Sequence, residues 1–325
     1  MSRVGVAFIG AGTVAEMHGR GLAACANARF IGAYDLDSAR AEAITAKFGG
    51  RVFDSLQQVL TNPDVDAVHV LTPVQHHVSH AIASLEAGKH VLLEKPVAET
   101  VEDIARLKAA ARQAARICMP AHNYIYVPSI RRAKRLLQSE KLGSIGSLWI
   151  MYNIHHSEQT AAIYGGVLRA VCNHHAYSVL YLLGRPRRVM ATTSRVHYQK
   201  LTCEDQAVII CEMENQAIAH LWSSFATNDP TTDPWTVLYK ILGTNGAVSY
   251  SWNEAQFEDH GGPAWGMPCY EDGFIGEIEY FINRCVLGGE QPLSTLDDAA
   301  DALRILMAAE RSVSKPETME KVVFE

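Results

Sequence analysis

The sequence predicts an α/β protein with a doubly wound parallel sheet, followed by an α+β domain with a large, mostly antiparallel open sheet. Two observations support this. Apolar strands alternate with amphipathic helices over residues 4–119, and long strand-like runs separated by hairpin turns fill much of residues 145–252. Strand–helix alternation is typical of parallel sheets, whereas hairpins join antiparallel strands. We therefore expect two domains, residues 1–121 and 122–325, with the last helices packing back near the first.

In the first domain, short apolar runs bounded by turn residues predict strands, and apolar residues at helical spacing predict helices. Gly88 marks one helix end, and Thr100 with Asp103 resembles a capping box at a helix start. The expected strands are Val4–Ile9, Arg29–Tyr34, Val52–Phe53, Val65–Leu71, Val91–Leu93 and Ile117–Met119. The expected helices follow Ala15 and span Ser38–Phe48, Ser55–Leu60, His77–Ala87 and Thr100–Ala115.

The second domain begins with a basic helix and continues mainly as strands. Hairpin turns are expected at Glu214-Asn215 and Thr244-Asn245-Gly246. The expected strands are Ile145–Ile154, Arg188–Val196, Gln206–Glu212, Ala217–Ser224, Trp235–Leu242 and Ala247–Trp252. The expected helices are Ser129–Gln138, Gly166–Leu183, Gly276–Val286 and Asp297–Ser314, with a loop at Gly261–Gly266.

Composition excludes several classes of partner. The 325 residues carry a net charge of -6, and the largest basic cluster, residues 131–135, reads as a solvated helix face, so we expect no nucleic-acid partner. No apolar run approaches the ~20 residues of a membrane helix, so we expect no membrane association. Seven scattered cysteines without a CxxC pair, and a start unlike a signal peptide, favour a cytoplasmic protein with reduced thiols.

A glycine-rich motif follows the first strand and opens a helix. Residues 10–15 read Gly10-Ala11-Gly12-Thr13-Val14-Ala15, the G-x-G-x-x-G/A pattern of dinucleotide-binding sites. Gly10 permits a tight turn, Gly12 lets a pyrophosphate approach the backbone, and Ala15 keeps helix and sheet close. The N–H groups of Thr13, Val14 and Ala15 would face the phosphates.

The second strand ends in an acidic residue at the spacing expected for a ribose contact. Asp35 lies 20 residues after Ala15, where a carboxylate accepts hydrogen bonds from ribose hydroxyls. The same charge would repel a 2′-phosphate, so NAD is favoured over NADP. Arg40 is close enough in sequence to help a phosphate if the loop folds back.

The segment on which the functional interpretation depends most is the predicted buried strand Val91–Leu93. It leads into Glu94-Lys95-Pro96. Open α/β sheets bind ligands at the carboxyl ends of their strands, so Lys95 is delivered to that edge. Pro96 cannot extend the ladder and restricts the backbone after the lysine. A solvated lysine at an ordinary strand end is the simpler alternative.

Several motifs, taken in order, resemble the glucose–fructose oxidoreductase, inositol dehydrogenase and rhizopine-catabolism (Gfo/Idh/MocA) family. They are the glycine motif, Thr72-Pro73 with His77, residues 87–91, residues 94–96, and Gly165-Gly166 leading to His174. The resemblance covers nearly the whole chain. It implies a Rossmann domain, a sheet domain that often forms dimers or tetramers, a tightly held nicotinamide cofactor, and hydride transfer at a sugar or cyclitol carbinol.

The resemblance also implies roles for individual residues. Lys95 and His174 would be catalytic, with Lys95 holding the substrate hydroxyl, and Glu94 would bond a cofactor ribose. Burial beside a cofactor would lower the pKa of Lys95 and suit it to proton transfer. Other expected cofactor contacts are Thr72, Pro73 and His77. The expected substrate contacts are Lys95, His122, Tyr124, His155, Tyr164, Asn173 and His174, although His122 and Tyr124 fit a simple domain linker nearly as well.

One position departs from the family pattern. Many members carry an Asp four residues before the catalytic His, and here that position is Ala170. Three alternatives follow: His174 works with Lys95 alone, another group replaces the carboxylate, or the reaction is unusual. Candidates for a replacement are Tyr164, His155, His156 and Asn173. Arg169 would point about 100° away from Ala170 on a helix.

The histidine pairs 155–156 and 174–175 do not predict a metal site. Neighbouring residues on a strand face opposite ways and neighbours on a helix diverge, so each pair aims one ring at a given point. No carboxylate or cysteine recurs at a supporting spacing, and we expect no metal.

The sequence thus predicts an NAD-dependent oxidoreductase that transfers a hydride between the nicotinamide and a carbinol or ketone of a sugar, glycoside, inositol or related polyol. We expect a homodimer or homotetramer formed through the second sheet. Two alternatives stay open: an NAD-retaining lyase or glycosidase that oxidises transiently, and a catalytically silent dinucleotide-binding sensor. The substrate, reaction direction and oligomer size are not determined by the sequence.

Overall fold

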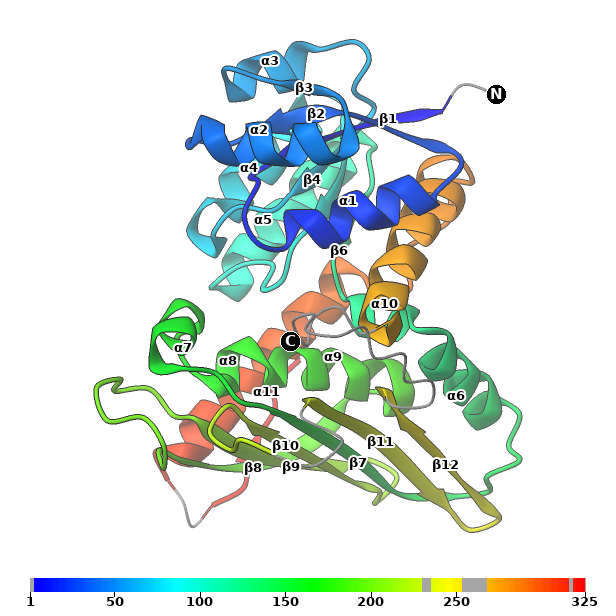
Figure 1. Ribbon diagram of the computed structural model, residues 1–325. Coiled ribbons are helices and arrows are strands. Elements are labelled where there is room, and N and C mark those ends of the chain that lie inside the picture. Colours follow the sequence, from blue (N-terminus) through cyan, green and yellow to red (C-terminus); the bar gives the residue numbers. More distant parts are fainter. Residues whose placement is uncertain (1–2, 230–234, 253–267, 316–317, 325) are drawn as a thin grey trace. The chain divides into compact units, whose positions relative to one another are not determined.

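The computed structural model describes residues 3–229, 235–252, 268–315 and 318–324. The chain forms two compact units, Met1–Val127 with Glu271–Ala300, and Pro128–Tyr270 with Asp301–Glu325 (Figure 1). The domain limits expected from the sequence, 1–121 and 122–325, stay a prediction. The expected loop at residues 261–266 lies outside the described residues.

The first unit contains a six-stranded parallel sheet in the order β3-β2-β1-β4-β5-β6. The strands are β1 (Val4–Ile9), β2 (Ala28–Tyr34), β3 (Arg51–Val52), β4 (Ala67–Val70), β5 (His90–Leu93) and β6 (Cys118–Pro120). The helices are α1 (Ala15–Ala24), α2 (Ser38–Phe48), α3 (Leu56–Thr61), α4 (Val74–Glu86), α5 (Val101–Ala114), the 3-10 turn η1 (Asn123–Tyr126), the π-helical η4 (Tyr280–Val286), and most of α10 (Pro268–Glu279).

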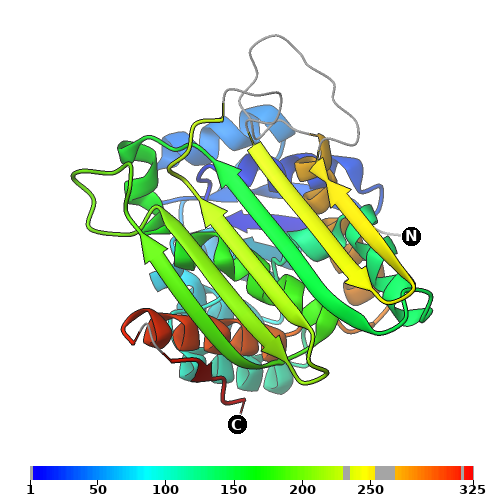
Figure 2. The same cartoon turned by 90° about the horizontal axis from the view of Figure 1, so that it is seen from below.

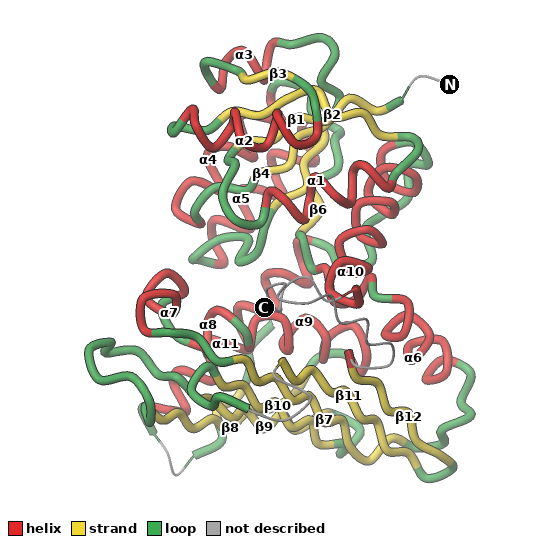
Figure 3. The backbone as a smooth tube through the Cα atoms, in the orientation of Figure 1, coloured by secondary structure: helices red, strands yellow, loops and turns green. Residues whose placement is uncertain are grey.

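The strand order reverses between β1 and β4, which makes the sheet doubly wound. Every residue of β1 and β4 is buried, as expected for inner parallel strands covered on both faces. Figure 3 shows the alternation of strands and helices in this unit. The predicted doubly wound parallel sheet is therefore confirmed, and its switch point lies at the carboxyl ends of β1 and β4.

Side-chain caps determine where several helices begin. Asp37 accepts a hydrogen bond from the Ala39 N–H, Ser55 from Gln58, and Thr100 from Asp103. Such bonds satisfy N–H groups that have no partner inside the helix. Within residues 1–127, strand and helix limits differ from the expected ones by up to three residues, because hydrogen bonding rather than polarity sets each boundary.

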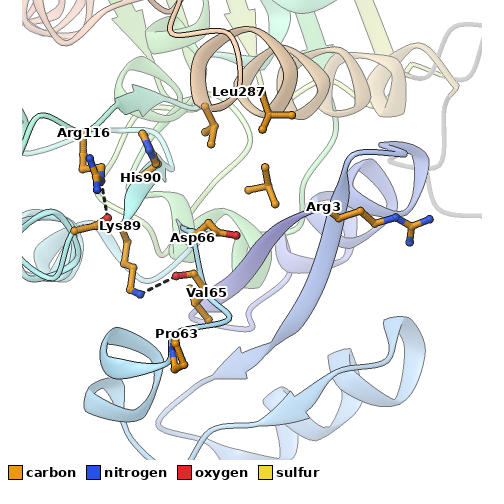
Figure 4. Close-up of a pocket in the computed structure, with 11 residues that line it drawn as sticks. Arg3, Pro63, Val65, Asp66, Lys89, His90, Arg116 and Leu287 are labelled. Carbon is orange, nitrogen blue, oxygen red and sulfur yellow. Dashed lines mark hydrogen bonds between the residues drawn. The ribbon is translucent and has the colours of Figure 1, made fainter. Parts of the chain in front are cut away.

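The segment of residues 87–91 closes turns at the amino-terminal edge of the sheet (Figure 4). The Lys89 ammonium donates to the carbonyls of Asn62, at 3.0 Å, and Val65, at 2.7 Å. The Arg116 Nε donates to the Gly88 carbonyl at 2.6 Å, and the His90 Nδ1 accepts the N–H of Ile117. These contacts tie together the loops before β4, β5 and β6. The motif therefore has a structural role at the edge opposite the glycine-rich turn.

The second unit contains a seven-stranded sheet in the order β12-β11-β7-β10-β9-β8-β13. Its strands are β7 (Ile145–Ile154), β8 (Pro186–Ser194), β9 (Gln206–Met213), β10 (Ile218–Ser224), β11 (Trp235–Gly243), β12 (Gly246–Ser251) and β13 (Glu320–Lys321). Its helices are α6 (Pro128–Gln138), α7 (Glu158–Tyr164), α8 (Val167–Ala170), α9 (Cys172–Leu183) and most of α11 (Leu296–Val313).

Neighbouring strands of this sheet run antiparallel except for β7 and β10, which are parallel. Within this unit, helices cover one face of the sheet, and Figure 2 shows the other face without a helical layer. The mostly antiparallel open sheet predicted from the sequence is confirmed.

The helices differ from the prediction in three places. The single helix expected over residues 166–183 is divided at Val171, whose φ of -105° departs from the helical value, so Ala170 and His174 belong to different helices. No element was predicted over residues 158–164, where Ser157 caps helix α7 and Gly165 ends it at a φ of 68°. The helix expected over residues 276–286 starts at Pro268 and changes to π-helical geometry at Tyr280.

Candidate active site

The turn after β1 requires glycine at its first position. Gly10 has a φ of +94°, a conformation that L side chains rarely adopt, and a Cβ there would lie 2.8 Å from the Leu71 carbonyl carbon and the Thr72 nitrogen. The Gly10 N–H donates to the Tyr34 carbonyl at 2.7 Å. The turn is therefore held tightly between β2 and the end of β4.

Gly12 differs from Gly10 because the space in front of it is open. A Cβ built at Gly12 would meet no atom within 4 Å, so the protein itself does not demand glycine here. Ala15, at the start of the ten-residue helix α1, is fully buried against the sheet. Open space over a glycine at the start of a helix is where a pyrophosphate binds. The turn thus fits a dinucleotide, with the N–H groups of Thr13 and Val14 beside it.

Asp35 lies against the same turn. Its Oδ2 accepts the Ala11 N–H at 2.7 Å, and its Oδ1 accepts the Asp37 N–H at 2.9 Å. The carboxylate is thereby held at the glycine-rich turn, and its contact with a ribose stays a prediction. Arg40, the cation considered for a 2′-phosphate, forms an ion pair with Asp37 at 3.4 Å.

Lys95 lies at the carboxyl end of β5 and is joined to Pro96 by a cis peptide bond. Burial lowers the pKa of the Lys95 ammonium, and the charge of Glu94 partly offsets this effect. A lysine with a lowered pKa can exchange a proton near neutral pH more readily than a surface lysine. Lys95 is therefore suited to act as an acid or base.

Glu94 points into the unit and is held from two sides. Its Oε1 accepts a hydrogen bond from the His18 Nε2 at 3.1 Å, and its Oε2 accepts the Lys95 N–H at 2.9 Å. Burial opposes ionisation, but the hydrogen bond from His18 and the charges of His18, Lys95 and His77 outweigh it and lower the pKa of Glu94. An ionised carboxylate thus stands beside Lys95.

A second histidine extends this buried network. The His18 Nδ1 lies 3.1 Å from the His69 Nδ1, so one ring donates and the other accepts. Burial, followed by the charge of His18, lowers the pKa of His69 well below its ordinary value. Both rings are fully buried. Sequence reasoning missed them, although a histidine in the apolar strand β4 was a visible signal of a buried polar partner.

Glu277 of α10 is a further buried carboxyl group in this unit. Burial and the charge of Glu94 raise the pKa of Glu277 well above its ordinary value, which favours the protonated form. Neither of its carboxyl oxygens has a hydrogen-bond partner among the described residues. The sequence offered no signal for this group because only packing buries it.

His77 and the β4–α4 turn support the end of β5. The His77 ring nitrogens lie 2.6 Å from the Thr72 carbonyl oxygen and 2.8 Å from the Pro96 carbonyl oxygen. Burial lowers the pKa of His77 despite these carbonyls, so the neutral ring donates to one of them. Pro73 precedes α4 as its N-cap residue. His77 therefore links the two turns where cofactor contacts were expected.

His122 and Tyr124 follow β6 and are almost completely buried, with exposed fractions of 1% and 3%. The His122 Nδ1 lies 2.6 Å from the Ser294 hydroxyl. Burial, together with the charge of Lys95, lowers the pKa of His122 to about 3, so its ring is neutral. His122 is thus electrostatically close to Lys95, whereas Tyr124 is part of the packed core around η1.

In the second unit, His174 lies in the first turn of α9 with an exposed fraction of 7%. Its Nδ1 is hydrogen-bonded to the hydroxyl of Tyr177, one turn further along the helix. The neighbouring Asn173 is equally buried, and its Nδ2 has no hydrogen-bond partner among the described residues. His175 points elsewhere, with its Nδ1 3.2 Å from the Ser223 hydroxyl.

The other residues expected near His174 have partners of their own. The Tyr164 ring stacks on His156 with centroids 5.6 Å apart, and the His155 Nδ1 lies 3.3 Å from the Ala226 carbonyl oxygen. The Arg169 Nη2 donates to Glu310 at 2.7 Å, so the arginine beside Ala170 is paired within this unit.

The described part of the chain contains no group of three or more His, Cys, Asp or Glu side chains arranged to hold a metal ion. None of its helices combines the length and the apolar character needed to cross a membrane. The first unit brings together the glycine-rich turn, Asp35, Thr72, His77, Glu94, Lys95 and His122. The second unit holds Asn173 and His174, so the expected catalytic pair is divided between the units.

Comparisons with known proteins agree with this geometry. The chain is 32% identical over 168 residues to 1-carboxy-3-chloro-3,4-dihydroxycyclohexa-1,5-diene dehydrogenase of Comamonas testosteroni, which is 50% of this chain and 42% of the relative. It is 30% identical over 152 residues to glucose-6-phosphate 3-dehydrogenase of Bacillus subtilis, 47% of this chain and 42% of that relative. The chain thus spans about two fifths of the length of each.

The fold also matches solved structures. A crystal structure described as a putative myo-inositol dehydrogenase from Sinorhizobium meliloti superposes with a TM-score of 0.87 at 22% identity, covering 98% of this chain and 100% of that one. The model of the Gfo/Idh/MocA oxidoreductase family, with an NAD-binding Rossmann fold, matches residues 4–122, and the model of its C-terminal domain matches residues 130–249. Because both halves of the chain match one family, the protein belongs to the Gfo/Idh/MocA oxidoreductases.

Proposed function

We propose that the protein is an NAD-dependent oxidoreductase that transfers a hydride between the nicotinamide and a carbinol or ketone of a cyclic polyol, sugar or glycoside. This proposal rests on one observation: two functional features of the first unit lie at the same edge of its parallel sheet. A dinucleotide-binding turn with Asp35 bonded to it stands at the carboxyl edge of the sheet, and Lys95 is delivered to the same edge with a lowered pKa. Ligands of open α/β sheets bind at this edge.

The substrate class is supported by the relatives. One is named for a dihydroxycyclohexadiene and the other for glucose-6-phosphate, so both names describe oxidation of a hydroxyl-bearing ring. We therefore assign this chain to ring carbinols rather than to open-chain alcohols. The individual substrate is left to the screen below.

The proposed reaction moves a hydride and a proton, and a different group accepts each. A nicotinamide held at the glycine-rich turn would supply the hydride acceptor for oxidation of the carbinol to the ketone. Lys95 would hold the substrate hydroxyl and stabilise the oxygen as it loses its proton, and His174 would take part in removing that proton. Glu94, ionised beside Lys95, keeps the positive charge of the ammonium compensated.

We propose NAD rather than NADP as the cofactor. The carboxylate of Asp35 is held at the glycine-rich turn, where it accepts from ribose hydroxyls and repels a phosphate. Arg40 is paired with Asp37 and so does not offset this charge. We further propose a cytoplasmic location, supported by free thiols at the cysteines described, such as Cys203.

The test is a paired screen with sugars, inositols and their keto forms, using NAD and NADP in parallel. Cofactor binding is read from the rise in melting temperature, because a ligand of the native state stabilises it by mass action. Turnover is read from NADH absorbance. We expect NAD to raise the melting temperature more than NADP, and at least one ring polyol to yield NADH. The absence of NADH with every polyol of the panel would refute the proposed activity, and an equal or larger rise in melting temperature with NADP would refute the choice of NAD.

We propose a homodimer or homotetramer formed through the uncovered face of the second sheet (Figure 2). Strand register brings Leu238, Met151, Trp222 and Val208 into one row across this face. In the next row, Trp149 stacks on His220 with ring centroids 3.9 Å apart and remains 43% exposed. Apolar side chains that stay partly exposed in neighbouring rows form a patch of the kind that marks association sites.

Light scattering coupled to size-exclusion chromatography tests this interface. Trp222→Glu should convert the oligomer to monomers because a carboxylate would be buried in an apolar contact. Gln159→Glu, on the exposed surface of α7, is the matched control and should leave the mass unchanged. A monomeric wild-type protein would overturn the proposal.

A further inference from the structure

The structure places a tyrosine behind the histidine that has lost its usual carboxylate. His174 and Tyr177 lie three residues apart on α9 and therefore on the same helix face. Both are buried, with exposed fractions of 7% and 1%, and their ring centroids are 5.5 Å apart at an angle of 67°. The Tyr177 hydroxyl is hydrogen-bonded to the His174 Nδ1.

An imidazole ring needs a partner on one nitrogen if the other is to exchange protons in a defined direction. The partner sets the tautomer and the ring orientation. Ala170, at the position where a carboxylate was expected, carries only a methyl group, and the helix break at Val171 separates it from α9. Tyr177 supplies a hydroxyl at the nitrogen in question.

Two of the side chains considered first for this role contact other groups, and the amide nitrogen of a third makes no hydrogen bond to any described residue. Tyr164 stacks on His156, and the His155 Nδ1 lies at the Ala226 carbonyl. Asn173 leaves its Nδ2 without a hydrogen-bond partner among the described residues. Tyr177 was not considered from the sequence because it follows His174 rather than preceding it.

We propose that Tyr177 is the positioning residue for His174, holding its Nδ1 so that proton exchange with the substrate hydroxyl proceeds through Nε2. This inference rests on the proposed function. A phenol differs from a carboxylate because it orients the ring without adding a negative charge, so the imidazolium form gains less electrostatic support. The pH dependence of turnover should therefore respond to the acidity of the phenol.

The first experiment reads the histidine directly and needs no substrate. The full-length protein is labelled with isotopic nitrogen in histidine, and the ring signals of wild type and Tyr177→Phe are compared by nuclear magnetic resonance. His174→Gln identifies the His174 signals. We expect the Nδ1 signal of His174 to shift in Tyr177→Phe while the signals of the other histidines stay in place. An unchanged Nδ1 signal would overturn the proposal.

The second experiment measures turnover with NAD and the ring polyol found in the screen. Tyr177→Phe should lower kcat about tenfold or more, as expected when a general base loses its orientation, with the KM for NAD unchanged. Tyr181→Phe, one turn further along α9, is the matched control and should retain full activity. Equal kcat values for Tyr177→Phe and wild type would overturn the proposal and leave the proposed function intact.

A third variant tests the proposal even if Tyr177→Phe fails to fold. Replacement of Tyr177 by 3,5-difluorotyrosine retains the ring and its hydroxyl but makes the hydroxyl more acidic. The pH profile of kcat should then shift relative to wild type, whereas a purely structural tyrosine would leave it in place. If the wild type oxidises no polyol, the proposed function fails, and the magnetic resonance result alone decides whether Tyr177 positions His174.

Discussion

Lys95 and His174 differ in the groups that contact them. Lys95 stands at a strand end, next to an ionised Glu94 that His18 holds from behind. His174 stands in the first turn of a helix and is held by the neutral phenol of Tyr177. Lys95 therefore has an ionised carboxylate beside it, and His174 has a phenol hydroxyl at its Nδ1.

This difference shows why the two residues carry different weight in the proposed function. The position of Lys95 follows from β5, whose hydrogen bonds within a parallel sheet leave the carboxyl end little freedom. The His174 Nδ1 is hydrogen-bonded to a side chain of its own helix, the Tyr177 hydroxyl. The following four substitutions test these assignments, and the one with the largest expected effect comes first.

Lys95→Met should abolish turnover while the protein still binds NAD. We expect kcat to fall by about 10³-fold, within the range for loss of a general acid or base, and His174→Asn to cause a smaller loss. Stopped-flow or steady-state NADH absorbance measures turnover, and tryptophan fluorescence measures cofactor binding. A larger loss in His174→Asn than in Lys95→Met would reverse the assignment of the main charged group.

His18→Leu should destabilise the first unit because the buried Glu94 would lose the donor to its Oε1. An unsatisfied buried carboxylate costs about 1–3 kcal/mol or more. Urea denaturation measures the change, and His76→Leu on the exposed surface of α4 is the control. Equal stability of the two variants would show that water or another group satisfies Glu94 without His18.

Glu277→Gln should stabilise the protein at alkaline pH. Because burial and the charge of Glu94 raise the pKa of Glu277 in the folded state, the folded protein binds a proton that the unfolded chain releases above pH ~4.3. Wild-type stability from this group is therefore lost as pH rises from that value toward the folded pKa. The variant should gain about 1–3 kcal/mol at pH 8 and nothing near pH 4.

The control for this prediction is Glu279→Gln, two residues along α10 and exposed. Denaturation curves at a series of pH values compare both variants with wild type. A gain for Glu277→Gln that does not grow with pH would mean that the Glu277 carboxyl group ionises normally in the folded protein.

Gly12→Ala should weaken NAD binding without changing the fold. A methyl group there meets no protein atom within 4 Å, but it would occupy the space assigned to the pyrophosphate. We expect the Kd for NAD to rise about tenfold, equivalent to ~1.4 kcal/mol, with an unchanged Tm of the unliganded protein. Gly146→Ala in β7, where a Cβ would lie 3.8 Å from the Leu242 carbonyl oxygen, is the matched control.

Much of the first unit was predictable because its signals are local. The glycine at position 10 is required by a positive φ, and Asp35 follows β2 directly, so both sites can be read along the chain. The cap residues Ser55 and Thr100 likewise announce helices that begin one residue later. The functions of individual residues at the site remain predictions.

The less predictable features depend on contacts between distant segments. His18 and Glu94 are 76 residues apart in the sequence, and nothing near either one indicates the other. The break at Val171 has no proline or glycine to mark it. Helix α7 was missed because its seven residues are too few for a helical period to stand out.

The sequence by itself determined the fold class, the dinucleotide-binding turn and the delivery of Lys95 to the carboxyl edge of the parallel sheet. These follow from strand polarity and from backbone conformations that few residues can adopt. The tertiary structure was needed to show which groups are hydrogen-bonded to Glu94, beside Lys95, and to His174. Hydrogen-bond partners of buried side chains are chosen by packing, so His18 behind Glu94 and Tyr177 behind His174 became visible only in the folded chain.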